Sequence, residues 1–156
     1  MPPRATSASL AALVDQEGAA LIPAILALAS EGALPPGAIP SAPGSRVPPL
    51  RPEHGILDFT RSAVAIDRQV RAAQGELHAH CFYRGMKLIV LEGAPVSSHH
   101  GAASGRIAAI EGDVVIVGAN PGAYGIRRFL FLDRVYAGAA LAAELGLAAG
   151  EAFTAR

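Results

Sequence analysis

The stretch that decides the fold is GILDFTRSAVAIDRQVRAAQG, residues 55–75. Its apolar positions recur every three to four residues, at Ala63, Ile66, Val70 and Ala73. This spacing predicts a helix over residues 62–73 with one buried face. Asp67 stands four residues before Arg71, a spacing at which opposite charges meet on a helix surface.

The residues that follow Gly75 have the composition of β-strands. Val, Ile, Leu, Phe and Tyr gather in five short segments, and turn residues separate most of them. The predicted strands are residues 78–84, 87–92, 105–110, 114–117 and 126–135, and a terminal helix is predicted over 137–147. We therefore expect an α+β chain whose main body is a five- to six-stranded Greek-key barrel over residues 76–136, of the oligonucleotide/oligosaccharide-binding (OB) type.

The N-terminal residues 1–31 are predicted to form a helical hairpin. Apolar residues recur there at helical spacing, and Gly18 is a candidate break between two short helices. The longest apolar run, residues 19–29, is shorter than the roughly 20 residues that a membrane-spanning helix needs. Asp15 and Glu17 occupy positions where a signal peptide would be basic or neutral. The sequence therefore predicts a cytoplasmic protein with no membrane partner.

A proline-rich connector follows, over residues 32–53. It holds seven of the twelve prolines of the chain, which removes backbone donors and favours extended geometry. The predicted organisation is thus a hairpin over 1–31, a linker over 32–53 and a domain over 54–156.

Charge and cysteine content exclude some classes of protein. The chain has 156 residues and a formal net charge of zero, which excludes a nucleic-acid binder that works by bulk positive charge. From His54 onward, ten basic residues less nine acidic ones leave +1. The single cysteine, Cys81, excludes an internal disulfide, fits a reducing cytosol and is predicted to be a small core residue.

The order of these pieces resembles the second half of methionyl-tRNA formyltransferase. In that family an acidic-Gly-Arg-Ile-Asp-Trp segment leads into a Ser-Ala-x-x-Ile helix that ends in Ile-Arg-Ala, and a barrel follows. Here residues 55–63 correspond to the family's segment and residues 66–72 to its helix. Residues 85–87 stand near the family's Gly-Lys hairpin, and residues 105–107 stand near its Pro-Gly-x-Ile strand. Residues 135–138 stand at the family's Gln-Pro-Ala-Gly stretch. Sugar-nucleotide N-formyltransferases and folate-dependent hydrogenase-maturation proteins share the same tail.

The resemblance implies a part of an enzyme that transfers a formyl group from 10-formyltetrahydrofolate to an amine. The family's catalytic Asn, His and Asp, and its Ser-Leu-Leu-Pro loop, have no counterpart here. We therefore expect no catalytic residue and no bound cofactor in this chain. The expected role is docking of substrate, with weak tRNA binding, beside a formyltransferase catalytic domain on another polypeptide. The alternatives are a stand-alone OB-type module that binds RNA or another ligand, and the tail of a sugar-nucleotide or small-amine N-formyltransferase.

Candidate substrate-binding residues are the cations of the predicted barrel: Arg84, Lys87, Arg106, Arg127 and Arg128. Strand alternation predicts that Arg127 shares a face with Phe129 and Phe131, and that Arg128 lies on the other face with Leu130. The aromatic residues are predicted to belong to the core, with a base-stacking platform as the alternative.

Four histidines form the only cluster with the character of metal ligands: His78, His80, His99 and His100. Alternation would place His78 and His80 on one face of a strand, where a loop histidine could complete a three-ligand zinc site. No carboxylate stands at a supporting spacing, so the prediction is that these histidines bind no metal.

Overall fold

The computed structural model describes residues 5–33, 37, 44, 48–75, 77–99 and 101–155. Most of the proline-rich connector lies outside these residues. The chain divides into two compact units, Met1–Leu50 and Arg51–Arg156, which are described separately. In chain order, the elements are α1 (Ser7–Ser30), the 3₁₀ turn η1 (Pro52–Gly55), α2 (Ala63–Ala72), β1 (His80–Tyr83), β2 (Met86–Val96), β3 (Ile107–Glu111), β4 (Val114–Gly118), β5 (Ala123–Phe131), β6 (Arg134–Ala137) and α3 (Gly138–Leu145).

The first unit contains one continuous helix, α1, where the sequence predicted a hairpin. A reciprocal capping box starts it: the Ser9 backbone N–H donates to Thr6 Oγ1 at 3.1 Å, and the Thr6 N–H donates to Ser9 Oγ at 2.9 Å. Gly18 does not break the helix, because one glycine costs only about 1 kcal/mol among strong helix formers. Gly32, at φ 67°, follows the last turn and ends the helix.

No residue of α1 is buried. Its exposed large apolar side chains are Leu13, Val14, Leu21, Ile22, Ile25, Leu26 and Leu28. By length and composition alone the helix could cross a membrane, a test that signal sequences and core helices also pass.

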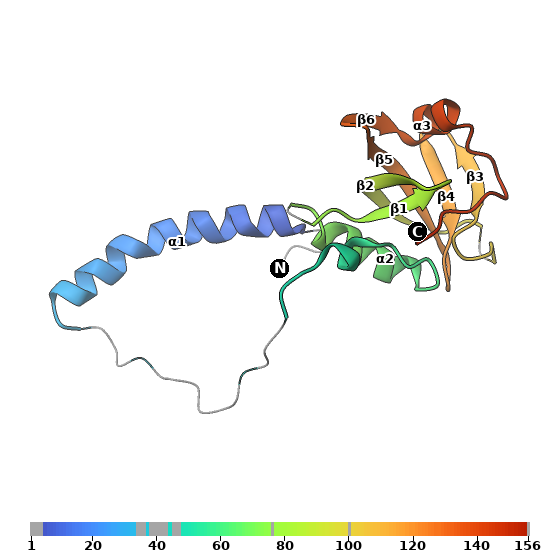
Figure 1. The fold of residues 1–156 in the computed structure, drawn as a ribbon. Coiled ribbons are helices and arrows are strands. Elements are labelled where there is room, and N and C mark those ends of the chain that lie inside the picture. The colour runs from blue at the N-terminus through green and yellow to red at the C-terminus, as the bar shows by residue number, and fades with distance from the viewer. Residues whose placement is uncertain are drawn as a thin grey trace. The chain divides into compact units, whose positions relative to one another are not determined.

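The second unit is an α+β domain with six antiparallel strands, as predicted, and its sheet is open where the sequence predicted a barrel. The strand order is β1-β2-β5-β4-β3, and β6 pairs with β5. Helices α2 and α3 lie at opposite ends of the sheet (Figure 1). The predicted helix over 62–73 is confirmed: the Ala65 N–H donates to the Ser62 cap, Ile66 and Val70 are buried, and Asp67 pairs with Arg71 at 2.9 Å.

The fifth predicted strand, residues 126–135, is two strands joined by a tight turn. β5 begins earlier than expected, at Ala123, and its pairing with β6 places Phe131 opposite Arg134. Between them Leu132 and Asp133 have φ values of 46° and 59°. Such turns favour Gly, Asn or Asp at both central positions, so Leu132 at the first position hides the turn signal of Asp133.

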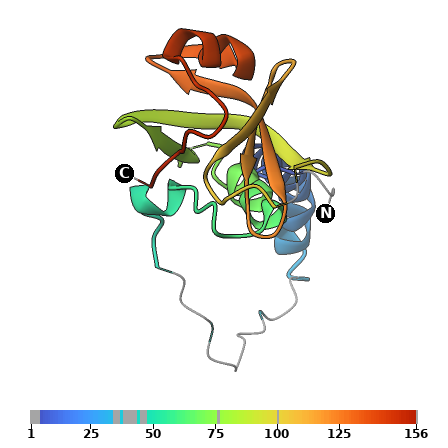
Figure 2. The ribbon, with the colours of Figure 1, turned by 90° about the vertical axis from the view of Figure 1, so that its right-hand side faces the viewer.

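The C-terminal segment, residues 146–155, joins the two edges of the sheet. Phe82 on β1 and Thr154 exchange backbone hydrogen bonds at 3.0 and 2.9 Å. Near the opposite edge, Ile107 on β3 donates to the Glu151 carbonyl oxygen at 2.7 Å. Figure 2 shows this segment, in dark red, descending from α3. The sheet is thus open, and the C-terminal segment connects its two edge strands, β1 and β3, by backbone hydrogen bonds.

The core lies on the side of the sheet that this segment helps to cover. Phe153 inserts there, and its ring centroid lies 6.2–6.3 Å from those of Phe59, Tyr83 and Phe129. All four aromatic side chains are at most 6% exposed. The segment is therefore held by apolar contacts on its inner side as well as by backbone hydrogen bonds.

Candidate functional site

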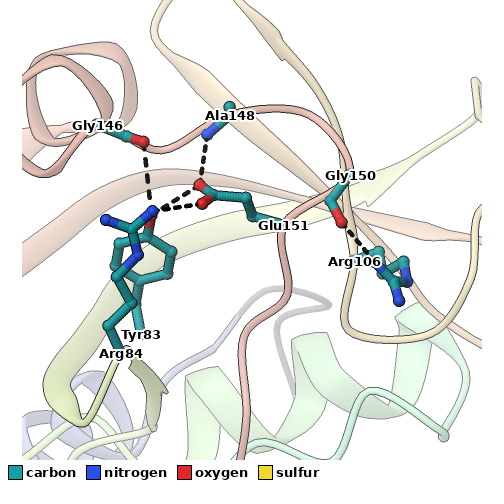
Figure 3. Close-up of polar contacts among 7 residues, drawn as sticks. All are labelled: Tyr83, Arg84, Arg106, Gly146, Ala148, Gly150 and Glu151. Atoms are coloured by element: carbon teal, nitrogen blue, oxygen red, sulfur yellow. Dashed lines mark hydrogen bonds and ion pairs between the residues drawn. The ribbon is translucent and has the colours of Figure 1, made fainter.

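Two of the five candidate cations hold the C-terminal segment in place. Arg84 Nη2 donates to Glu151 Oε1 at 2.7 Å, and Arg106 Nη1 donates to the Gly150 carbonyl oxygen at 2.6 Å. The Arg84 guanidinium also lies 4.9 Å from the centroid of the Tyr83 ring. Figure 3 shows both arginines directed at the segment. Arg84 and Arg106 thus have structural partners.

Glu151 is the centre of this polar cluster. Its Oε2 accepts hydrogen bonds from the Tyr83 hydroxyl at 2.7 Å and from the Ala148 backbone N–H at 2.9 Å (Figure 3). The Tyr83 bond, followed by those from Ala148 and Arg84, lowers the pKa of the Glu151 carboxyl. Burial and the bond to Glu151 raise the pKa of the Tyr83 hydroxyl. Sequence reasoning missed Glu151, because its partner lies 68 residues away.

Arg127 and Arg128 line a surface depression of about 440 Å³, which we call the β5 depression. It forms where β5 changes neighbours: Ile126 pairs with Val115 of β4, and Arg128 pairs with Ala137 of β6. The depression is lined by Glu92, Asp113, Val114, Arg127, Arg128, Val135 and Ala137.

The predicted alternation along β5 fails at this point. Both Arg127 and Arg128 are exposed, because the β2–β5 register shifts around Glu92, which lies opposite Arg128. Phe129 is fully buried and Phe131 is half-buried. Phe129 therefore belongs to the core as predicted and cannot stack on a base.

The candidate cations are divided among different surroundings. Lys87 is exposed at the start of β2, opposite Phe82 of β1, and does not line the β5 depression. Arg127 and Arg128 line one cavity together.

The candidate metal ligands are likewise separated. His80 is 5% exposed, and its Nδ1 lies 2.9 Å from the carbonyl oxygen of His78, whose own side chain is exposed. His99 Nε2 lies 3.3 Å from Glu111 Oε1 on β3, and His100 lies outside the described residues. Among the residues that the structure describes, no three His, Cys, Asp or Glu side chains are grouped so that they could hold a metal ion.

Cys81 is fully buried in β1, and burial raises the pKa of its thiol. It is a core residue, as the sequence predicted. Asn120, the only asparagine of the chain, lies in the connection between β4 and β5, where its backbone N–H donates to the Arg61 carbonyl oxygen at 3.0 Å.

The second unit is an antiparallel sheet flanked by two helices, an arrangement that can be compared with known protein families. The family model for the formyl transferase C-terminal domain matches residues 49–134, more than half of the chain. The protein therefore belongs to the formyl transferase C-terminal domain family, and the family resemblance in the sequence is confirmed at that level. No curated protein sequence matches the chain.

Solved structures show the same fold. A multiply substituted variant of HypX from Aquifex aeolicus superposes with a TM-score of 0.67 and 18% identity, over 95% of this chain and 27% of that one. HypX from the same organism in complex with tetrahydrofolic acid gives a TM-score of 0.59 and 18% identity, over 81% of this chain and 22% of that one. The chain thus spans about a quarter of the length of these proteins.

Proposed function

We propose that this chain is the C-terminal substrate-docking part of a 10-formyltetrahydrofolate-dependent formyltransferase, which works with a catalytic domain outside residues 1–156. One observation carries the proposal: a formyl transferase C-terminal domain follows an apolar helix that has no buried residue. Exposed apolar surface of this extent marks a contact with another molecule. In the family that the sequence resembles, a catalytic domain works with this C-terminal domain, so we propose a catalytic domain as the partner of α1.

The charges of α1 favour a protein partner over a lipid bilayer. Asp15 and Glu17 lie near the middle of the helix, and only thirteen residues, 18–30, follow them before the helix ends. A bilayer core requires about 20 apolar residues, and an acidic side chain at its centre costs about 2.5–3.5 kcal/mol. A protein surface can leave these two carboxylates in water while it covers the apolar sides of the helix. A cytoplasmic location follows from this proposal.

The β5 depression does not fit the folate cofactor. The depression is lined by four charged side chains and no aromatic residue, and the nearby ring of Phe129 is buried in the core. A pterin ring would find no apolar cleft there. In this proposal the catalytic domain alone holds 10-formyltetrahydrofolate.

For the formyl acceptor we propose methionyl-tRNA, bound weakly by this domain. Lys87, Arg127 and Arg128 are exposed cations that make no hydrogen bond or ion pair with the described residues. Three phosphate contacts predict a slope of about −2 to −3 for log K against log salt. Fluorescence anisotropy with labelled tRNA at several salt concentrations measures the slope. Absence of binding at low salt would exclude the tRNA acceptor and leave the family role intact.

The docking proposal is tested by co-purification with a catalytic domain of the same genome, identified by its Asn, His and Ser-Leu-Leu-Pro loop. The coding strand upstream of Met1 is the first place to look for it. We expect a complex with the wild-type chain, and its loss in the Leu21→Glu/Ile25→Glu variant.

Leu50→Glu is the matched control, because Leu50 is 71% exposed and lies outside α1. Circular dichroism should show that both variants keep their helix and sheet content. Equal complex formation by the two variants, or none by the wild-type chain, would refute docking through α1 and favour a stand-alone ligand-binding module.

A further inference from the structure

The β5 depression combines four charged side chains that lack partners. Glu92, Asp113, Arg127 and Arg128 line it, and none of their side chains makes a hydrogen bond or ion pair with the residues that the structure describes. Elsewhere in the domain, by contrast, Asp67, Arg84 and Glu151 are paired. Two free cations and two free anions in one cavity are available to a ligand that needs both.

The local backbone explains why both arginines face solvent. The β2–β5 pairing shifts register on both sides of Glu92: Glu92 pairs with Arg128, out of the register that Val90–Phe129 and Gly93–Ile126 share. Like a bulge, such an irregularity redirects side chains that regular alternation would place on opposite faces. Buried Ile126 and Phe129 fix the strand on either side. The two guanidinium groups thus start from a rigid part of the sheet.

The floor of the cavity is held by close backbone packing. A Cβ at Gly138 would lie 2.6 Å from the Asp113 carbonyl oxygen and 2.9 Å from that of Ile126, and the Gly138 N–H donates to the Asp113 carbonyl oxygen at 3.0 Å. Asp113 is thereby fixed beside the start of α3. Only glycine allows this approach, so the cavity wall next to Asp113 has a defined position.

The chemistry of these side chains selects the ligand. A guanidinium group binds a phosphate through two parallel hydrogen bonds. An ionised carboxylate only accepts hydrogen bonds, so Glu92 and Asp113 require donors from the ligand, and the neighbouring hydroxyls of a ribose supply them. Val114 and the half-exposed Val135 offer apolar contact to a sugar or base.

We propose that the β5 depression binds a ribonucleotide, with Arg127 and Arg128 on its phosphate and Glu92 and Asp113 on its ribose hydroxyls. A volume of about 440 Å³ lies in the range of small-ligand sites. The same chemistry is presented by a free nucleotide and by the 3′ end of an RNA strand. The proposal goes beyond the docking function and does not depend on a catalytic domain.

Nuclear magnetic resonance titration of the ¹⁵N-labelled chain tests the site with AMP, 2′-deoxy-AMP and inorganic phosphate. AMP should shift the backbone amides of residues 113, 127 and 128. We expect AMP to bind roughly tenfold more tightly than the deoxy compound, because each lost hydrogen bond to a charged group is worth about that factor. Inorganic phosphate should compete with AMP.

Three variants assign the roles. The change Arg127→Gln/Arg128→Gln should weaken AMP binding by roughly tenfold or more, while Glu92→Gln/Asp113→Asn should bring the AMP to deoxy-AMP ratio close to one. Arg134→Gln is the control, since Arg134 is an exposed arginine of β6 that does not line the cavity. It should leave binding within about twofold of the wild-type chain.

Three results would overturn the proposal: equal binding of AMP and deoxy-AMP, no binding of AMP, or equal effects of the Arg134 and Arg127/Arg128 changes.

A short RNA with an intact 3′ end, compared with the same RNA after periodate oxidation of its terminal diol, identifies the source of the ligand. Tighter binding of the intact RNA than of AMP, lost on oxidation, assigns the site to an RNA end. Equal binding of both RNAs, weaker than that of AMP, assigns it to a free nucleotide. The docking proposal is tested by co-purification with a catalytic domain, so its failure and the failure of this ligand site are observed in separate experiments.

Discussion

The Tyr83 hydroxyl lies 2.7 Å from Glu151 Oε2, across 68 residues of sequence. Tyr83 belongs to edge strand β1, and Glu151 belongs to the C-terminal segment, which also forms a hydrogen bond with β3. This hydrogen bond therefore helps to join the two ends of the sheet. Because the tyrosine ring is buried beside Phe153, the bond also fixes the segment from inside the core.

Replacing Tyr83 with Phe should lower Tm by several degrees. The substitution removes only the hydroxyl, so that Glu151 loses a donor while the aromatic packing stays. Differential scanning calorimetry measures the change. Tyr136→Phe removes a hydroxyl that has no hydrogen bond to the described residues and should leave Tm unchanged. Equal shifts in the two variants would refute a specific role for Tyr83.

Acid should weaken the attachment of the C-terminal segment. The pKa of Glu151 is lower in the folded state than its ordinary value, because Tyr83, Ala148 and Arg84 donate to the carboxylate. Its stabilising effect is therefore complete above the ordinary pKa of glutamate and is lost as pH falls through the lowered value. Asp58, whose pKa is lowered by hydrogen bonds from Thr60, acts in the same direction.

Thermal unfolding from about pH 7 down to about pH 3 measures this dependence. The Glu151→Gln variant should lose part of the acid sensitivity and should be less stable than the wild-type chain at neutral pH. A variant that kept the complete pH dependence of the wild-type chain would show that Glu151 does not contribute.

The Cys81 thiol should not react with a water-soluble disulfide reagent while the domain is folded. It is completely buried, so the reagent cannot reach it. Burial also raises the pKa of its thiol, so the reactive thiolate does not form. Reaction should become complete in denaturant. Rapid labelling of the native chain would show that β1 leaves the sheet easily.

Replacing Gly93 with Ala should destabilise the domain by about 1–3 kcal/mol through overpacking. A Cβ at this position would lie 2.6 Å from Tyr124 Cε1 and 2.7 Å from the Gly125 carbonyl oxygen. Denaturant unfolding measures the loss. Gly18→Ala is the opposite case, since no atom lies within 4 Å of a Cβ there, and it should stabilise α1 by about 0.5–1 kcal/mol. Destabilisation by both changes would contradict this account.

The purified chain should not formylate methionyl-tRNA when it is supplied with 10-formyltetrahydrofolate. Formyl transfer requires a base for the attacking amine and a donor for the oxyanion, and each typically contributes 10²-fold or more. Asn120, the sole asparagine, is followed two positions later by Gly122, where the family's Asn-x-His pattern has histidine. Acid-gel separation of the tRNA measures the product. Turnover that depends on a histidine of this chain would overturn the prediction.

Local sequence patterns were sufficient for most of the domain. The apolar spacing at Ile66 and Val70 identified α2, and the composition of β2 to β4 identified their strands to within a few residues. The turn at Leu132 and Asp133 could not be predicted, because leucine disfavours positive φ and the surrounding strands impose it. The continuity of α1 through Gly18 was missed because the glycine was taken as a break, whereas one glycine costs only about 1 kcal/mol inside a helix of strong formers.

The candidate site was only partly predictable, because it depends on contacts between distant residues. The sequence predicted Arg84, Arg106, Arg127 and Arg128 together as substrate-binding cations. No local pattern shows that Arg84 donates to Glu151, or that Arg106 donates to the Gly150 carbonyl oxygen. Alternation likewise cannot foresee a register shift opposite Glu92. Which cations remain available for a ligand is therefore decided by tertiary structure.

The C-terminal segment also has a consequence for self-association. An unpaired edge strand is a template for addition of a strand from another molecule. Residues 150–154 occupy backbone groups of Phe82 and Ile107 at the two edges, so proteolysis just before Gly150 would uncover both edges at once. A molecule with two uncovered edges can bind one neighbour on each side, which is the geometry of a growing fibre.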